Sequence, residues 1–212
     1  VDQSVAIALE AGVSLGAMPV FRFGTDAQRA QFLPNLLAGR ALAGFGLTEP
    51  EAGSDAGSTR TTARLEGTEW VIDGAKQFIT NSGTAITQFV TVTAVTGHRG
   101  DRKEISTIIV PNGTAGFEVG PGYDKVGWHA SAAHPLIFTG ARVPEANLLG
   151  ERGRGFANFL SILDEGRVAI AALATGAAEG CLDAALDYAQ SRQVFGERLG
   201  SRQSIQFMIA RM

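Results

Sequence analysis

The sequence predicts an α+β protein of several domains, with a helical lead, a central antiparallel β-barrel and the start of a C-terminal helical bundle. Two observations support this fold class. Apolar residues recur at helical spacing near both ends of the chain, whereas residues 44–143 carry short β-branched segments separated by turn signals. We therefore expect a helical domain to end at 1–43, a β-barrel domain over 44–150, and a helical bundle to begin at 151–212.

Two helices are expected before the first strand. Residues 1–20 carry apolar side chains at every fourth position, and we expect this helix to end near Pro19 because proline lacks the backbone donor that a helix interior needs. Gly24-Thr25-Asp26 then predicts a helix start, with a second helix over 27–37. Pro34 lies inside this second helix and predicts that it is short or kinked.

The middle of the chain is expected to be all-β. Asp73-Gly74 is a turn signal, and the charged run from His98 to Glu104 is expected to connect two strands. The expected strands are 41–47, 59–65, 69–72, 76–80, 86–96, 105–110, 117–119 and 135–143. Many short strands at close spacing are typical of a barrel or a sandwich. Helical spacing resumes at Arg154 and continues to Ser191-Arg192, and another helix begins at Gln203.

The composition is that of a chain with few charges. Hydrophobic residues make up 45%, charged residues make up 18%, and the net charge is −3. A low charged fraction indicates surface that is covered by partner subunits, a cofactor or further chain. The net charge argues against nucleic acid and anionic membrane as partners. No apolar run approaches the ~18–20 residues that cross a bilayer, so we expect no membrane span.

The single cysteine and the three histidines predict no covalent or metal site. Cys181 has no partner for an internal disulfide, and we expect a small buried residue in a reducing compartment. The scattered histidines form no metal-binding pattern. We expect His134 to be a loop residue and Trp128 to be a packing residue. Gly176 and Gly180, four apart among alanines, predict close helix packing.

A glycine-rich loop at 46–58 is the strongest local signal in the chain. It follows an apolar strand, and its glycines allow close approach of a ligand to the backbone. Consecutive N–H groups in such a turn suit an anion, and Thr48, Ser54 and Ser58 add hydroxyl donors. By itself the pattern fits a phosphate or cofactor loop and an ordinary turn after a strand equally well.

Four motifs, in this order and at consistent spacing, resemble those of the acyl-CoA dehydrogenase family. They read GLTEPEAGSDAGS at 46–58, DGAKQFITNSG at 73–83, RVPEANLLG at 142–150 and SRQVFGERL at 191–199, with Gln203 after the last. The resemblance covers nearly the whole chain. It implies FAD as cofactor, an acyl-CoA thioester as substrate, and α,β-dehydrogenation to the trans-2-enoyl-CoA with electrons passed to an electron-transfer flavoprotein. The chain lacks an initiator Met, so we expect a fragment without part of the N-terminal helical domain and most of the C-terminal one.

The resemblance also implies roles for single residues. Leu47 and Thr48 bind the flavin pyrimidine edge, where negative charge grows on reduction, and Thr80 bonds the flavin N5. Phe78 packs on the flavin, although much of the family has Trp there. The implied cofactor-binding residues are Phe45, Leu47, Thr48, Gly53, Ser54, Phe78, Ile79, Thr80, Arg192, Phe195 and Gln203. The implied substrate-binding residues are Ser54, Asp164 and Arg167.

Several of these residues have an ordinary structural interpretation as well. Phe45 suits either a flavin contact or the core, Phe195 alone is more often a core aromatic, and Thr80 alone is an ordinary strand residue. Arg167 alone more often pairs with Asp164 on a helix surface. Arg192, Phe195 and Gln203 resemble residues that reach the FAD of a neighbouring subunit, which implies a homo-oligomer, a dimer or tetramer, with a shared FAD site.

No catalytic base is expected within this chain. Most of the family places a Glu late in the C-terminal domain, and a minority places it directly before the residue that corresponds to Arg167. That position is Gly166 here. Glu165 lies about 100° around the helix from it and is expected to point elsewhere. Glu49 and Glu51 flank the glycine-rich loop without matching any family base.

The resemblance leaves three alternatives for the function. The first is a dehydrogenase, the second is an oxidase or flavin monooxygenase of the same fold, and the third is a non-catalytic paralogue that binds acyl-CoA or FAD. Ile7, Ala8 and Ala11 are expected near the end of the acyl pocket, and their small size predicts room for a medium or longer chain. The expected location is the cytoplasm in a bacterium or the mitochondrial matrix in a eukaryote.

Overall fold

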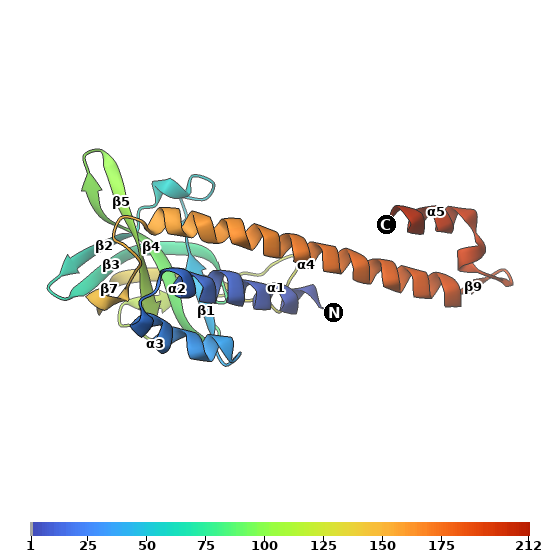
Figure 1. Cartoon of the computed structure of the whole chain (residues 1–212), viewed down its shortest axis with the longest axis horizontal. Helices are drawn as coiled ribbons and strands as arrows, with labels where there is room; N and C mark the ends of the chain where they lie inside the picture. Colours follow the sequence, from blue (N-terminus) through green and yellow to red (C-terminus); the bar gives the residue numbers. More distant parts are fainter. Residues whose placement is uncertain (1) are drawn as a thin grey trace.

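The computed structural model describes residues 2–212 and has three parts (Figure 1). N-terminal helices pack beside one mixed sheet, and a long C-terminal helix runs from the sheet to a small hairpin and a last helix. The expected α+β class, with helices before and after a central sheet, is confirmed.

The N-terminal lead is one continuous helical rod, and its expected end near Pro19 is wrong. It consists of α1 (Gln3–Ala11), a π-helical segment (Gly12–Ala17) and α2 (Met18–Phe23). Pro19 follows directly on the π-helical segment, where the i→i−5 bond from the Met18 N–H to the Val13 carbonyl leads into α2 and accommodates a residue without an N–H. The helix therefore continues through the proline.

The second helix, α3 (Asp26–Leu37), begins with a capping box. The Thr25 hydroxyl accepts from the Gln28 N–H at 3.2 Å, and the Gln28 side chain accepts from the Thr25 N–H at 2.9 Å. Each side chain thus satisfies a donor that the helix leaves free. The helix passes through Pro34 and keeps the full expected length.

The central sheet has eight strands and is mixed rather than antiparallel. The strands are β1 (Leu42–Gly46), β2 (Thr62–Glu66), β3 (Glu69–Thr80), β4 (Thr87–Arg99), β5 (Arg102–Pro111), β6 (Phe117–Val119), β7 (Ala133–Pro144) and β8 (Leu148–Leu149). They lie in the order β6-β7-β3-β2-β4-β5-β8, with β1 on β4. β1 and β2 both run parallel to β4, because each takes a different stretch of the same edge. The end strands β6 and β8 do not pair within residues 2–212, so a closed barrel is not shown.

The turn expected at Asp73-Gly74 is wrong, because β3 continues through it as a bulge. The register of β3 against β7 shifts between Ile72 and Gly74. Gly74 has φ +143, and a Cβ there would lie 2.7 Å from the Thr61 Cα. A glycine is therefore required, for close backbone approach rather than for a chain reversal.

Two apolar clusters hold the sheet and helices together. One lies within the sheet and includes the buried Trp70, Ile72 and Phe138. The other joins α2 and α3 to the sheet, with the rings of Phe32 and Phe89 5.0 Å apart at 64°. This second cluster fixes the N-terminal helices against β1 and β4, which positions the cavities described below.

The long helix α4 (Gly155–Ser191) has the extent that its spacing predicts. Its first half packs on the sheet, and its second half extends beyond it (Figure 1). Cys181 lies in the extended half and is exposed, so the expected burial is wrong. A Cβ at Gly176 or Gly180 would meet no atom within 4 Å, so the structure shows no packed partner at either glycine. The hairpin of β9 (Gln193–Val194) and β10 (Glu197–Arg198) and helix α5 (Gln203–Arg211) lie at the far end.

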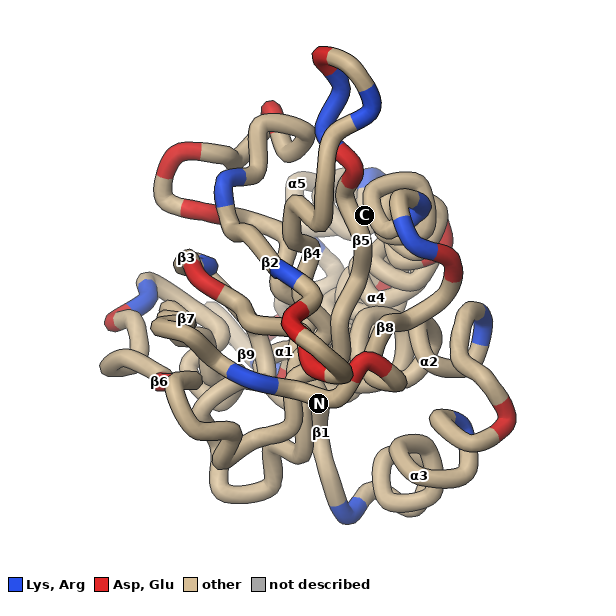
Figure 2. The backbone as a smooth tube through the Cα atoms, turned by 90° about the vertical axis from the view of Figure 1, so that its left-hand side faces the viewer, with Lys and Arg blue, Asp and Glu red and all other residues tan. Residues whose placement is uncertain are grey.

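Two helical stretches, Gln3–Phe23 and Gly155–Ser191, have the length and apolar composition of a membrane span. The sequence-based expectation that no segment approaches those limits is therefore wrong. Core helices of soluble proteins also meet them, and the first stretch packs partly against the sheet. Charges of both signs alternate along the loops and helix surfaces (Figure 2).

Candidate functional site

Two neighbouring cavities lie between the N-terminal helices, the end of β3 and the first half of α4. The smaller has a volume of about 430 Å³ and the larger about 690 Å³. The residues that line both are Ala11, Leu15, Phe78, Thr80, Leu163 and Arg167. Because these walls are shared, the two cavities adjoin each other.

The smaller cavity gathers most of the residues that the motifs predict. Its lining includes Phe45, Leu47, Thr48, Gly53, Ser54, Phe78, Ile79, Thr80 and Arg167. These residues come from β1, the glycine-rich loop, the end of β3 and α4, which are far apart in the sequence. The structure therefore brings the first two motifs and the long helix to one place.

Donors from the glycine-rich loop and from the end of β3 have no partner within residues 2–212. The Thr48 N–H and the hydroxyls of Thr48, Ser54 and Thr80 make no hydrogen bond to the described chain. The walls between them are apolar. Such a set suits a flat, acceptor-rich ligand whose ring contacts apolar side chains while its edge accepts hydrogen bonds.

The two aromatic residues of the cavity, Phe45 and Phe78, differ in how they are packed. Phe45 stacks on Phe159 with ring centroids 3.8 Å apart at 22°, so it both packs against α4 and lines the cavity. Phe78 has φ +60, is 61% exposed and lies 4.9 Å from the ring of Tyr123. A positive φ at a bulky residue is strained, and here it turns the ring out of the sheet into both cavities.

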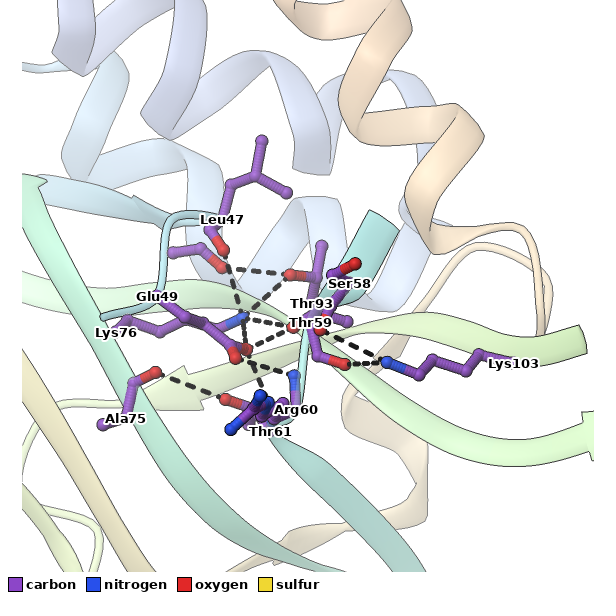
Figure 3. A network of polar contacts seen from close by, with 11 residues as sticks. Leu47, Glu49, Ser58, Thr59, Arg60, Thr61, Ala75, Lys76, Thr93 and Lys103 are labelled. Atoms are coloured by element: carbon purple, nitrogen blue, oxygen red, sulfur yellow. Dashed lines mark hydrogen bonds and ion pairs between the residues drawn. The ribbon is translucent and has the colours of Figure 1, made fainter. Parts of the chain in front are cut away.

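Beneath the glycine-rich loop lies a fully buried ion pair (Figure 3). Lys76 Nζ donates to Glu49 Oε1 at 2.7 Å, to Thr93 Oγ1 at 3.0 Å, to Thr59 Oγ1 at 3.2 Å and to the Leu47 carbonyl at 3.3 Å. The side chains of Lys76 and Glu49 are 0% and 5% exposed. No pattern in the sequence distinguishes these two charges from surface residues.

Glu49 is satisfied from a second direction. It accepts from the Arg60 N–H at 2.7 Å, from the Thr61 N–H at 3.1 Å and from the Thr59 hydroxyl. The loop backbone is held at Thr48 as well, because the Thr48 carbonyl accepts from the Gln77 N–H at 2.8 Å. The loop is thus attached to β3 at Lys76 and Gln77.

The pair is ionised at neutral pH. Desolvation raises the pKa of Glu49, but the charge and hydrogen bond of Lys76 and the bonds from Thr59 and Arg60 outweigh it and lower that pKa to about 2. Desolvation lowers the pKa of Lys76 to about 8, against the opposing charge and hydrogen bond of Glu49. The ammonium and the carboxylate therefore persist together in the core.

The larger cavity is mainly apolar, and the sequence indicated only part of it. Ile7 and Ala11 line it as expected, whereas Ala8 does not and instead accepts a hydrogen bond from Asn81 at 2.9 Å. Trp128 is 48% exposed and lines the cavity, so its expected role in packing is wrong. The sequence reasoning missed the other lining residues, which include Glu10, Leu15, Tyr123, Asp124, Lys125, Leu163 and Ile170.

The helix turn at 164–167 has two residues that line the larger cavity and one that pairs elsewhere. Gly166 lines the cavity, while Glu165 pairs with Arg22 on α2 and is absent from both linings. Arg167 lines both cavities and pairs with the exposed Asp164. Asp164 itself lines neither cavity. Any binding role of Asp164 and Arg167 stays a prediction.

The remaining predicted residues are not near the cavities. Arg192, Phe195 and Gln203 lie at the hairpin and α5, beyond the far end of α4 (Figure 1). Phe195 is 92% exposed with φ +55, and the Arg202 guanidinium lies over its ring at 5.3 Å. It is not a core aromatic in this structure. His134 is half-buried and bonds the Gly120 carbonyl at 2.9 Å.

Three family models match successive parts of the chain. They describe the acyl-CoA dehydrogenase N-terminal domain over 1–40, the middle domain over 44–141 and the C-terminal domain over 153–212. The chain is 49% identical to a probable acyl-CoA dehydrogenase, YngJ, of Bacillus subtilis, over 99% of this chain and 55% of the relative. It is 43% identical to a short-chain specific acyl-CoA dehydrogenase of Megasphaera elsdenii, over 100% and 55%. The chain thus spans about half the length of these curated relatives.

Solved structures show the same arrangement. Butyryl-CoA dehydrogenase from Megasphaera elsdenii matches with TM-score 0.92 and 42% identity, over 99% of this chain and 55% of that one. A chain from work on the electron transferring flavoprotein of Acidaminococcus fermentans matches with TM-score 0.93 and 40% identity, over 100% and 55%. An acyl-CoA dehydrogenase of Bacillus anthracis complexed with FAD matches with TM-score 0.90 and 37% identity, over 98% and 35%.

Proposed function

This chain belongs to the acyl-CoA dehydrogenase family, and from that premise we propose that it forms the flavin-binding and acyl-binding centre of an FAD-dependent acyl-CoA dehydrogenase. The observation that carries the proposal is the pair of adjoining cavities. The smaller has unpartnered donors at Thr48, Ser54 and Thr80, and the larger is apolar. The donor set fits an acceptor-rich ring, and the apolar walls fit an acyl chain.

In this proposal FAD, when bound, supplies the acceptor for the hydride that leaves the substrate β-carbon. The Thr48 N–H and hydroxyl would hold the pyrimidine edge of the flavin, where negative charge develops, and the Thr80 hydroxyl would donate to the flavin N5. Phe78 separates the two cavities and packs on the ring. The apolar walls around Ile7 and Leu163 keep water from the acyl chain.

The α-proton needs a base, and we propose that none of the residues predicted from the motifs supplies it. Glu165 is held by Arg22, away from both cavities. Glu49 is buried against Lys76, which helps to lower its pKa to about 2 and makes it a weak base, and both of its oxygens already accept hydrogen bonds. Glu10 and Asp124 line the larger cavity, and substitution of each by its amide in the full gene product tests whether either takes the proton.

A homo-oligomer with a shared cofactor site is part of the proposal. Phe195 is exposed at the far end of α4 from the cavity that contains Thr48 and Thr80, so it reaches a flavin only in another copy. Transfer of electrons to an electron-transfer flavoprotein is supported by the match to a chain from work on such a protein. Ile7 and Ala11 leave room for a medium or longer acyl chain, whereas one relative is named as short-chain specific.

The test is made on the full gene product with FAD. We expect a yellow protein whose flavin absorbance bleaches when acyl-CoA of suitable length is added anaerobically, and which reduces an electron-transfer flavoprotein or a dye. Oxygen consumption with acyl-CoA in place of dye reduction would assign it to the oxidases. Binding without bleaching would assign it to the non-catalytic paralogues, and a protein that does not bind FAD would overturn the proposal.

A further inference from the structure

The buried Lys76–Glu49 pair contacts the binding loop at a backbone carbonyl. Among the four acceptors of Lys76 Nζ, three are side chains and the fourth is the Leu47 carbonyl, at 3.3 Å. A lysine with zero exposure is costly to bury, and Glu49 balances the charge without requiring the bond to Leu47. That bond therefore fixes the backbone of the loop, at Leu47, to the ammonium group on β3.

The same bond determines which way the next N–H points. No peptide bond in residues 2–212 is cis, so the carbonyl of Leu47 and the N–H of Thr48 point in opposite directions from one planar unit. The carbonyl points into the core toward Lys76. The N–H then points outward, on the side where Leu47 and Thr48 line the smaller cavity, and it has no partner in the described chain.

We infer that Lys76, held by Glu49, is a positioning residue for the ligand edge that Thr48 binds: by holding the Leu47 carbonyl in the core it presents the Thr48 N–H to the smaller cavity. The inference rests on the proposed function, because the ligand edge is that of the flavin. Lys76 itself has no exposed atom and does not touch the ligand.

Strand β3, which carries Lys76, also carries the second donor of the smaller cavity, the Thr80 hydroxyl. Gln77 donates to the Thr48 carbonyl at 2.8 Å, and β3 ends three residues later at Thr80. The loop donor and the strand donor are therefore attached to one rigid segment. With the Leu47 carbonyl released, the peptide is free to rotate and to present an acceptor oxygen to the cavity in place of a donor.

The charge on Lys76 matters for this role. An ammonium donates more strongly than a neutral group, and its three protons serve four acceptors around it. It also lies directly beneath a peptide whose N–H faces a site where negative charge develops. The dipole of that peptide is thus held with its positive end toward the developing charge.

The experiment compares Lys76→Met with the double variant Glu49→Gln/Lys76→Met in the full gene product. The methionine removes the donor, and in the double variant no charge is left unpaired. The amide oxygen of the glutamine can keep the bonds that Thr59 and Thr61 donate to Oε1, whereas the bond that Arg60 donates to Oε2 is lost. The matched control is Ser106→Ala, which removes a buried hydroxyl that accepts from Gly153 at 2.9 Å, on β5 and away from Leu47. The readouts are the Kd for FAD, the flavin absorption spectrum and the two-electron potential.

We expect both Lys76 variants to raise the Kd for FAD about tenfold or more, the loss typical of one charge-assisted bond. If the Thr48 N–H favours the reduced ring about tenfold, its loss lowers the two-electron potential by about 30 mV. The spectrum should shift in both Lys76 variants, and Ser106→Ala should change neither spectrum nor potential.

The inference is overturned if the double variant folds and retains the wild-type potential and spectrum. If Lys76→Met does not fold, the double variant decides the question by itself. A wild-type protein that does not bind FAD would instead refute the proposed function, so the two failures are distinguishable.

Discussion

Removing Lys76 alone should destabilise the protein far more than removing the whole charge pair. The pKa of Glu49 falls from 4.5 to about 2, which corresponds to about 3 kcal/mol of stabilisation at neutral pH. The pKa of Lys76 falls from 10.5 to about 8, which costs a similar amount. Both shifts contain the same attraction between the two charges, so they are not added; they show that desolvation and attraction oppose each other within the pair, and the net contribution of such buried pairs to stability is usually small.

The single and the double substitution are therefore expected to differ in their free energy of unfolding. Lys76→Met leaves the Glu49 carboxylate buried without its cation and should lower the free energy of unfolding by about 3–5 kcal/mol. Glu49→Gln/Lys76→Met leaves no unpaired charge and loses only the bond from the Arg60 N–H, so it should cost about 1–2 kcal/mol, clearly less than the single variant. The control for lost packing is the double variant itself, because it contains the same methionine.

The pH dependence has opposite signs in the wild type and in Lys76→Met. In the wild type, the unfolded chain protonates Glu49 near 4.5 and the folded chain only near 2, so stability falls as pH drops through that interval. In Lys76→Met, burial raises the pKa of the isolated Glu49 above its ordinary value, so the folded chain takes up the proton first. The deficit of the variant should therefore shrink on acidification.

Urea unfolding, followed by the fluorescence of the buried Trp70, measures both effects at fixed protein and FAD concentrations. Midpoints at about pH 7 and about pH 4 are compared for the wild type, the single variant and the double variant. A deficit of Lys76→Met that is the same at both pH values would refute the assignment of its cost to an unpaired carboxylate. A double variant as unstable as the single one would attribute the loss to packing.

Three further predictions use other parts of the structure. Gly74→Ala should cost about 3 kcal/mol in a urea titration against about 1 kcal/mol for Gly67→Ala, because both have positive φ but only at Gly74 does a Cβ meet backbone; equal costs would contradict the bulge. Glu165→Gln should retain FAD and turnover and lose under about 1 kcal/mol, since its pair with Arg22 is exposed; loss of turnover with FAD bound would identify it as the base. Phe195→Ala should weaken FAD binding about tenfold while the unfolding midpoint changes little, and unchanged binding would argue against a shared site.

Local signals predicted those features that depend on neighbours in the sequence. The helix start at Gly24-Thr25-Asp26 needs only neighbouring residues, and α4 follows from its own apolar spacing. Pro19 and Asp73-Gly74 gave wrong predictions because their local signals are overruled by their surroundings in the structure. Each is a strong local breaker, but the π-helical segment before Pro19 and the close approach of Thr61 at Gly74 make the residue suitable for a continuous element.

The cavity residues were predictable as a set only through the spaced motifs, and their supporting pair was not predictable at all. Glu49 and Lys76 are 27 residues apart, and no local pattern separates them from charges on a solvated surface. Strict alternation would also place Lys76, Phe78 and Thr80 on one face of β3. The register of β3 shifts between Lys76 and Ile79, and Phe78 takes φ +60 within that shift. This irregularity turns Phe78 out into the cavities while Lys76 stays in the core. One strand thus both supports the loop from beneath and lines the cavity, an arrangement that depends on a backbone conformation that phenylalanine rarely adopts.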